Sequence, residues 1–175
     1  MVREWWLRAA LVLQSPRAVF VALRDDTDEA ASDRAEPVLL IVLLAGAAAA
    51  LASAASTGYD GLLLVVWAFL AGGITGAAGY WLLGAVLYWA AHALGSLGSY
   101  RRARHVFAFA SVPLAISLVL SPVGHGVFQW LFRAFAAWSA ALLLVGVRSV
   151  HGWTWARAAA AAAAPVAVLS LLLAL

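Results

Sequence analysis

One stretch decides how the chain lies in a membrane: Gly95–Pro113, which reads GSLGSYRRARHVFAFASVP. Its arginines form a strongly basic cluster between two apolar blocks, so they determine on which side of a membrane the neighbouring segments lie. The glycines predict a turn, and Ser99 is a suitable N-cap for a helix that begins at Tyr100. Pro113 lies in the apolar part of that helix. It lacks an N–H and crowds a carbonyl, so we expect a kink there.

The composition is typical of a polytopic membrane protein. The 175 residues are 66% hydrophobic and 11% charged, with a mean hydropathy of +0.96, whereas a soluble domain has about 25% charged residues. Cysteine is absent, which excludes disulfides and thiolate metal sites. The basic residues are spread over segments that flank apolar blocks, so the pI near 10.0 predicts no binding to nucleic acid. An alanine-rich, lysine-free chain is typical of a GC-rich bacterial genome, so we expect a bacterial plasma membrane.

The hydropathy pattern predicts an all-α fold with two regions. Residues 1–36 are expected to form cytoplasmic amphipathic helices and an acidic linker, and residues 37–175 a bundle of five transmembrane helices. Pro37 is expected to open the first span. The predicted spans are Val38–Ser56, Ile74–Leu94, Val106–Leu120, Val127–Val147 and Trp153–Leu175.

Arginine, tryptophan, leucine and phenylalanine alternate over residues 1–24. This pattern suits helices that lie among lipid headgroups, and helices packed against the bundle are the alternative. Ser15-Pro16 is a cap and first turn for the second of them. The acidic stretch Arg24–Glu36 lacks the glycine and the spacing of a calcium-binding loop, so we expect a solvated loop or a short helix.

The stretch Leu62–Leu94 is longer than one crossing needs, since its apolar residues would rise about 50 Å as a helix. We predict an interfacial or re-entrant piece over Leu62–Ala71, followed by a hinge at Gly72-Gly73 and then the second span. A single long tilted helix is the alternative. Gly72, Gly76 and Gly79 give this helix a smooth surface for close packing.

Two segments carry a resemblance to a known family. The first has a glycine-rich turn, an aromatic and a basic residue, and an aromatic-Ala-Ser-x-Pro entry to a helix. Its residues are Gly95, Gly98, Ser99, Tyr100, Arg101, Phe107, Ala108, Phe109, Ala110, Ser111 and Pro113. The second is a Pro-x-x-x-Phe segment, Ser15-Pro16-Arg17-Ala18-Val19-Phe20, followed by Leu23.

With these segments the chain resembles bacterial members of the Yip family (Ypt/Rab-interacting proteins). The resemblance implies a membrane adaptor or organising protein. The Asp-Leu-Tyr-Gly-Pro box of eukaryotic members is missing, and Tyr59-Asp60-Gly61 is no substitute. The resemblance therefore gives no support to a Rab-type partner.

Motifs for catalysis do not occur: there is no nucleophile elbow, His-Glu-x-x-His, phosphate-binding loop or dinucleotide fingerprint. His92, His105 and His151 fall near one membrane face, but they come from separate segments without ligand spacing, so interfacial histidines are favoured over a metal or haem site. We therefore predict no enzyme, no metal and no cofactor. A small transporter or lipid-handling protein is the alternative to an adaptor. Transporters bury several ionisable residues, whereas the predicted spans contain a single charged residue away from their ends, Arg133. This difference favours the adaptor.

The charge distribution predicts a cytoplasmic N-terminus and a C-terminus outside, because all arginines except Arg133 fall on one side of the five spans. The expected partners are an anionic cytoplasmic leaflet and an unidentified membrane or cytosolic protein, and a homo-oligomer stays open. Tyr100, Arg101 and Arg104 are the predicted partner contacts. Arg133 is predicted either to pair with Asp60 or to snorkel outward.

Overall fold

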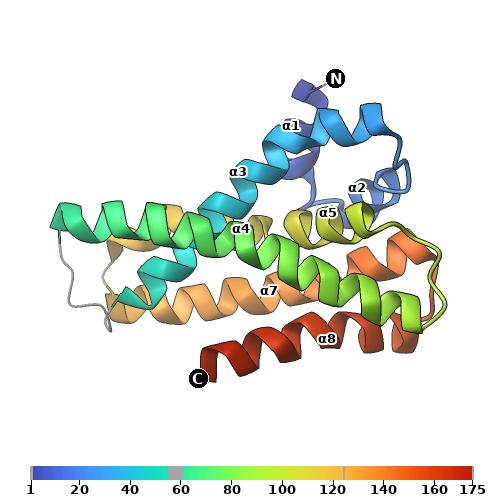
Figure 1. Cartoon of the computed structure of the whole chain (residues 1–175). Coiled ribbons are helices and arrows are strands. Elements are labelled where there is room, and N and C mark those ends of the chain that lie inside the picture. Colours follow the sequence, from blue (N-terminus) through green and yellow to red (C-terminus); the bar gives the residue numbers. More distant parts are fainter. Residues whose placement is uncertain (1, 55–60, 124, 175) are drawn as a thin grey trace.

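The structure is a computed structural model that describes residues 2–54, 61–123 and 125–174. Within those residues every regular element is a helix and no strand occurs. The elements are α1 (Val2–Leu11), α2 (Pro16–Ala22), α3 (Asp28–Ala52), α4 (Gly61–Ala93), α5 (Tyr100–Ala110), α6 (Val112–Ser117), the 3₁₀ helix η2 (Leu118–Val123), α7 (His125–His151) and α8 (Trp155–Ala174). Figure 1 shows a bundle of long helices with α1 and α2 gathered at one end. The predicted all-α class is confirmed.

Several helices have the length and the composition to cross a membrane. Within the described residues these are Asp28–Ala52, Gly61–Ala93, Tyr100–Pro122 and Gly126–His151, and the apolar part of α8, Trp155–Leu171, is shorter. The surface of α4 carries large apolar side chains such as Leu62 and Ile74, which are 79% and 73% exposed. An exposed apolar surface of this kind is stable against lipid and not against water. The chain is therefore an integral membrane protein.

Helix α3 begins well before the expected first span. Thr27 is its N-cap, since its Oγ1 accepts a hydrogen bond from the Ala30 N–H at 3.3 Å. Asp28 and Glu29 add negative charge to the first turn, where it interacts favourably with the helix dipole. Pro37 lies inside the helix, so the helix of the first span does not begin at this proline as expected. The hydrophilic residues after Thr27 form the first turns of α3.

Helix α4 is one continuous helix of 33 residues. The prediction of a separate interfacial or re-entrant piece over Leu62–Ala71 is wrong, and the helix has no break at Gly72-Gly73. A helix of this length rises about 50 Å, so it tilts or extends beyond a hydrocarbon core about 30 Å thick. One long helix, which the sequence left as an alternative, is the observed arrangement.

The glycines of α4 mark the place where α3 crosses it. A Cβ added at Gly72 would lie 2.6 Å from the Gly46 carbonyl oxygen, and Cβ atoms at Gly46 and Gly76 would overlap the carbonyls of Gly72 and Val42. The two backbones are therefore in direct contact, which only glycine permits. Close packing, and not a break in the helix, explains Gly72.

The third apolar stretch is divided into α5, α6 and η2. Its start is as expected, because Ser99 Oγ accepts a hydrogen bond from the Arg102 N–H at 3.0 Å. Helix α5 ends at Ala110 and α6 begins at Val112, with Pro113 in its first turn. A proline without an N–H suits a first turn, so the interruption lies where the sequence placed a kink.

Helices α1 and α2 pack against the bundle, which is the alternative that the sequence left open. Trp5 of α1 is buried, and its ring lies 5.7 Å from that of Phe109 in α5. Phe20 of α2 fills the space beside Gly146 of α7, where a Cβ would come within 2.9 Å of the Phe20 ring. The opposite face of α1 keeps Leu7 exposed. The N-terminal helices therefore belong to the main core.

Candidate functional site

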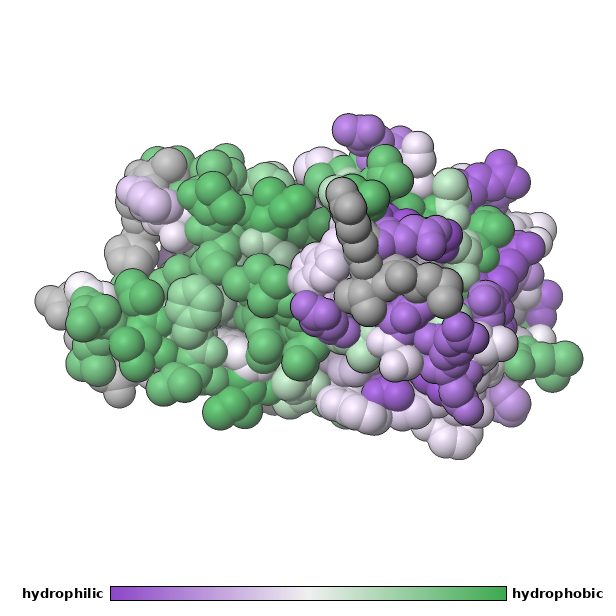
Figure 2. All heavy atoms as spheres, turned by 90° about the horizontal axis from the view of Figure 1, so that it is seen from above, coloured by the Kyte–Doolittle hydropathy of each residue, from purple (hydrophilic) through white to green (hydrophobic). Residues whose placement is uncertain are grey.

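Charged side chains gather at one end of the bundle. Figure 2 shows hydrophilic residues over that end and hydrophobic residues over the other. We call it the polar end; it comprises α1, α2, the linker Arg24–Thr27, the α4–α5 turn, the start of α5 and the end of α7 (Figure 1). The predicted partner contacts Tyr100, Arg101 and Arg104 lie there.

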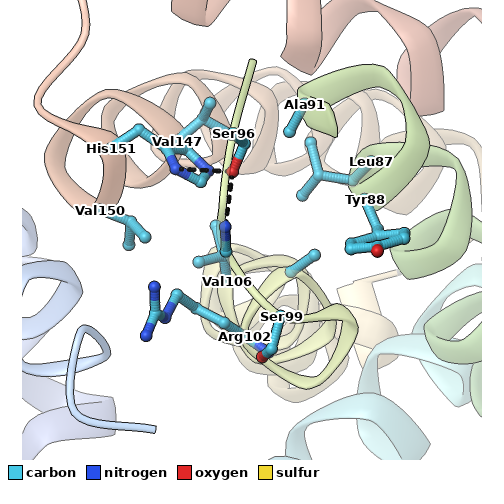
Figure 3. Close-up of a pocket in the computed structure, with 12 residues that line it drawn as sticks. Leu87, Tyr88, Ala91, Ser96, Ser99, Arg102, Val106, Val147, Val150 and His151 are labelled. Atoms are coloured by element: carbon cyan, nitrogen blue, oxygen red, sulfur yellow. Dashed lines mark hydrogen bonds between the residues drawn. The ribbon is translucent and has the colours of Figure 1, made fainter. Parts of the chain in front are cut away.

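A small cavity beneath the α4–α5 turn is lined in part by His151 and Ser96 (Figure 3). Ser96 Oγ lies 3.2 Å from His151 Nδ1 and accepts a hydrogen bond from the Gly98 N–H at 3.0 Å. The cavity measures about 10 Å³, which is about the space of one water molecule. His92 and His105 do not line it, and no group of metal-binding side chains occurs among the described residues. The cavity is therefore a packing feature of the turn and not a substrate site.

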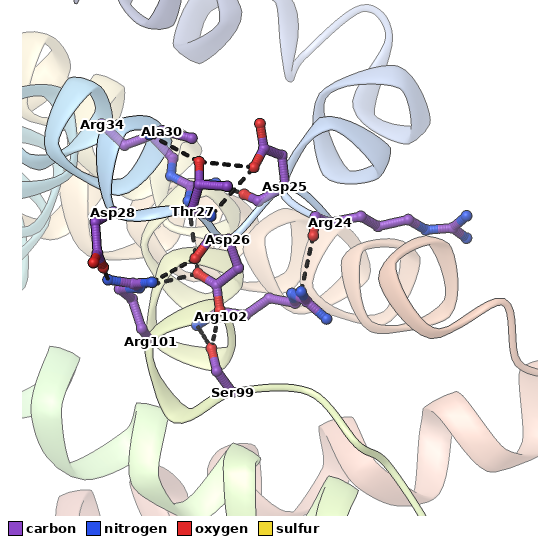
Figure 4. Close-up of polar contacts among 10 residues, drawn as sticks. All are labelled: Arg24, Asp25, Asp26, Thr27, Asp28, Ala30, Arg34, Ser99, Arg101 and Arg102. Atoms are coloured by element: carbon purple, nitrogen blue, oxygen red, sulfur yellow. Dashed lines mark hydrogen bonds and ion pairs between the residues drawn. The ribbon is translucent and has the colours of Figure 1, made fainter.

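Asp26 is the centre of an ion-pair network at the polar end (Figure 4). Its Oδ1 lies 3.1 Å from Arg101 Nε, and its Oδ2 accepts a hydrogen bond from Ser99 Oγ. Arg101 also reaches Asp28, with Nη1 and Oδ1 2.6 Å apart, and donates to the Asp26 carbonyl oxygen. The network fixes the linker before α3 to the first turn of α5.

Arg34 lies beneath this network and is fully buried. Its Nη1 donates to the Asp25 carbonyl oxygen at 2.9 Å, and its Nη2 lies 3.7 Å from Asp26 Oδ1. Its guanidinium group also lies 5.2 Å from the centre of the Trp5 ring. A buried cation is stable only beside opposite charge or a polarisable face. Asp26 therefore interacts with the buried Arg34 and the partly exposed Arg101 at the same time.

Arg102 and Arg24 extend the connection to α7. Arg102 Nη2 donates to the Arg24 carbonyl oxygen at 2.8 Å. The Arg24 side chain points away from the acidic residues (Figure 4) and donates to the carbonyl oxygens of Ser149 at 2.6 Å and Val150 at 3.1 Å. These carbonyls belong to the last turn of α7 and have no partner within the helix. Arg24 thus caps α7.

The linker carboxylates are held in their charged form. Burial raises the pKa of Asp26, but hydrogen bonds from Ser99 and Arg101, with the charges of Arg101 and Arg102, outweigh it and bring the pKa below its ordinary value. The pKa of Asp25 is lowered as well, chiefly because the backbone N–H and the hydroxyl of Thr27 donate to it. Both carboxylates are therefore negatively charged and offset the positive charge of the surrounding arginines.

Arg104 lies in a cage of aromatic rings. Its guanidinium group lies 3.7 Å from the centre of the Trp81 ring, 4.6 Å from that of Tyr100 and 5.1 Å from that of Tyr80. The Tyr100 hydroxyl donates to the Trp81 carbonyl oxygen at 2.9 Å. Helices α4 and α5 touch here, because a Cβ on Gly84 would overlap the Arg104 side chain. Cation–π contacts and close packing thus hold α5 on α4.

The three predicted partner contacts are therefore already engaged within the chain. Arg101 turns toward the linker and Arg104 toward α4, although their spacing places both on neighbouring positions of α5. The Arg101 side chain keeps 34% of its surface exposed, and Tyr100 and Arg104 are half-buried. Part of each side chain remains accessible at the polar end.

Arg133 lies exposed on α7, away from the polar end. Its guanidinium group lies 4.7 Å from the centre of the Trp130 ring, which is one turn closer to the start of α7. The side chain is thus directed toward the end of the bundle opposite the polar end, as snorkelling requires. Asp60, its predicted partner, lies outside the described residues, so this pairing stays a prediction.

The sequence pattern does not predict the acidic half of the network. It predicts a solvated loop or a short helix for the stretch that contains Asp26, Asp28 and Arg34. The signal that could have revealed the network is charge complementarity. The predicted topology places an acidic linker and a basic helix start on the same side of the membrane, where oppositely charged segments can meet.

The comparison with protein families identifies the chain. A family model described as Yip1 domain matches residues 10–175, which run from α1 through α8. The chain belongs to the Yip1 domain family. Searches of curated proteins and of solved structures return no match.

In this Yip1 domain the two segments that carried the resemblance lie together at the polar end. Val106 from the first and Phe20 from the second both pack at Gly146, where a Cβ would come within 3.0 Å and 2.9 Å of their side chains. At the surface, Arg102 of the first segment donates a hydrogen bond to the carbonyl oxygen of Arg24, which directly follows the second. Mutual packing is thus one physical reason for the residue types in both segments.

Proposed function

We propose that this Yip1 domain protein is a non-enzymatic membrane adaptor or organising protein that presents its polar end to a protein partner. The observation that carries the proposal is the ordered polar surface at one end of an otherwise apolar bundle (Figure 2). The contacts of Asp26 with Arg34 and Arg101 hold this surface in one shape. A preorganised surface loses little conformational entropy on binding, which suits a docking platform.

The distribution of arginines supports a cytoplasmic polar end. Apart from Arg133, the arginines lie in α1, α2 and the linker, or in the parts of α3, α5, α7 and α8 that meet at the polar end. The positive-inside rule places such segments in the cytoplasm. Anionic lipids of that leaflet would hold the surface at the level of the headgroups.

Arg101 is the contact residue that we propose, together with its neighbours Tyr100 and Arg104. Its guanidinium group is shared between Asp26, whose side chain is 11% exposed, and Asp28, whose side chain is 97% exposed. The pair with Asp28 is therefore weak and easily exchanged. An acidic group of a partner takes the place of Asp28 and leaves the Asp26 pair intact.

Co-purification from the native membrane tests this proposal. Arg101→Ala should lower the recovery of the partner, whereas Asp28→Asn should raise it, because it removes the competing carboxylate. Arg8→Ala, at a partly exposed arginine of α1 that pairs with Glu4, is the matched control and should leave recovery unchanged. If Asp28→Asn and Arg101→Ala both lower recovery in proportion to lost stability, Arg101 acts only within the fold.

A small transporter or lipid-handling protein is the second candidate, and one cavity favours it. The cavity measures about 320 Å³ and lies between α5, α6, α7 and α8, with mostly apolar walls. Ser139 Oγ lies at this cavity, and among the described residues it has no hydrogen-bond partner. Purified protein in liposomes separates the candidates. An adaptor shows no flux of solute or fluorescent lipid above that of empty vesicles, and robust flux would favour the second candidate.

A further inference from the structure

A pocket on the polar end has a basic wall. It measures about 350 Å³, and its lining includes Arg17, Arg24, Arg148, Ser149, Gly152 and Trp153, with no acidic residue. Small-molecule sites commonly occupy about 300–1,000 Å³. The pocket is thus large enough for a small anionic group, and its charge is of one sign.

Two segments far apart in the sequence build this pocket. Arg17 and Arg24 are seven residues apart, so α2 and the turn after it present them on one face. Phe20, three residues after Arg17 and four before Arg24, lies beside them on α2 and is buried against α7. Arg148 and Gly152 are four residues apart at the end of α7. Packing of α2 on α7 therefore brings the arginines to a common space.

The positive charge of the pocket is uncompensated. Arg17 is exposed and forms no ion pair in the part of the chain that the structure describes. The Arg148 guanidinium group lies 4.2 Å from the centre of the Trp155 ring, and its buried Nε has no hydrogen-bond partner among the described residues. Arg24 donates to the carbonyl oxygens of Ser149 and Val150, which are neutral, and the linker acids Asp26 and Asp28 are engaged by Arg101 and Arg34.

We propose that this pocket binds a phosphate group, carried by the headgroup of an anionic phospholipid. Arginine forks match the geometry of phosphate oxygens and bind them with short, charge-assisted hydrogen bonds. Trp153 in the wall and Trp155 beside Arg148 lie where α7 ends and α8 begins, and tryptophans at helix ends mark the depth of the headgroups. A free phosphate would use the same groups, and the experiment separates the two sources.

Native mass spectrometry of the purified full chain in detergent provides the test. The chain is titrated with phosphatidylglycerol, with phosphatidylcholine and with inorganic phosphate. We expect adducts of phosphatidylglycerol in excess over phosphatidylcholine. Arg17→Gln and Arg148→Gln should each weaken that binding roughly fivefold, the effect of one cation near an anionic headgroup. Arg8→Gln carries the same charge change outside the pocket and should leave binding unchanged.

Each outcome of this titration either supports or overturns the proposal. Phosphatidylglycerol that resists millimolar inorganic phosphate identifies the lipid headgroup as the source, whereas displacement at that concentration identifies free phosphate. Equal binding of both lipids, or an equal loss in Arg8→Gln, overturns the proposal. Arg17 is exposed, so its variant is expected to keep the fold, and Arg148→Lys should restore most of the affinity if charge is what the pocket supplies.

Discussion

Asp26 interacts with two arginines that differ in their exposure to water. Arg34 is fully buried and has its Nη2 3.7 Å from Asp26, whereas Arg101 is about a third exposed and makes a hydrogen bond to the same oxygen. Water screens the second pair but not the first, so the stabilising effect of Asp26 comes mainly from Arg34. This single carboxylate therefore decides whether the start of α3 can bury an arginine.

Replacing Asp26 by Asn should destabilise the protein by about 3 kcal/mol, because it leaves Arg34 buried without an opposite charge. Asp28→Asn is the matched control. Asp28 is 97% exposed, so its loss should change the free energy of unfolding by less than about 1 kcal/mol. Reversible unfolding in mixed micelles, followed by tryptophan fluorescence, measures both. Equal effects of the two variants would contradict this role of Asp26.

The lowered pKa of Asp26 predicts how stability depends on pH. A group whose pKa is lower in the folded state stabilises that state fully above its ordinary pKa, near 3.8, and the contribution disappears as the pH falls through the folded value. The wild type should therefore lose stability below about pH 4. Asp26→Asn should show a smaller loss over this range, because Asp25, whose pKa is also lowered, keeps its own contribution. A thermal unfolding series between pH 2.5 and pH 7 compares the two proteins, and parallel curves would refute the assignment.

At the scale of elements, the close crossing of α3 and α4 organises the middle of the bundle. Gly46 and Gly72 allow backbone contact, so the helices gain dispersion contacts that side chains would prevent. From the sequence of α4 alone, Gly72-Gly73 resembles a hinge. The reason for the glycine lies in α3, whose backbone fills the space beside Gly72.

Gly46→Ala should destabilise the protein by about 1–3 kcal/mol, because the added methyl group overlaps the Gly72 carbonyl. Gly79→Ala is its matched control, since the nearest atom to a Cβ there is 4.0 Å away. It should be neutral or stabilise α4 by up to about 1 kcal/mol through helix propensity. The same unfolding assay measures both. A stable Gly46→Ala variant would show that the crossing is looser than described.

Other elements could be predicted because their signals are local. Ser99 caps the helix at Tyr100 through its side chain, the fixed φ of Pro16 suits the first turn after Ser15, and both helices begin where expected. The sequence predicts a solvated loop or a short helix over Arg24–Glu36, although Thr27 is a local start signal for α3 because it caps the helix through the Ala30 N–H. The pairs of Asp26 and Asp28 with Arg101 of α5 are not local, since they form across the polar end. Long-range pairs of this kind leave no periodic pattern in one sequence.

At the scale of the whole molecule, the polar end and the apolar bundle divide the chain into two environments. Figure 2 shows this division, and the positive-inside rule predicts that the arginine-rich polar end faces the cytoplasm. The adaptor proposal requires the polar end to face the cytoplasm. The orientation is therefore the central claim, and the cysteine-free chain makes it directly measurable.

Single cysteines introduced by Leu97→Cys, at the fully exposed tip of the α4–α5 turn, and by Gly126→Cys, in open space at the start of α7, report the two ends. A membrane-impermeant thiol reagent is applied to intact cells and to inside-out vesicles. Our account predicts that intact cells label the cysteine at position 126 and inside-out vesicles label the one at position 97. Labelling of position 97 in intact cells would contradict it.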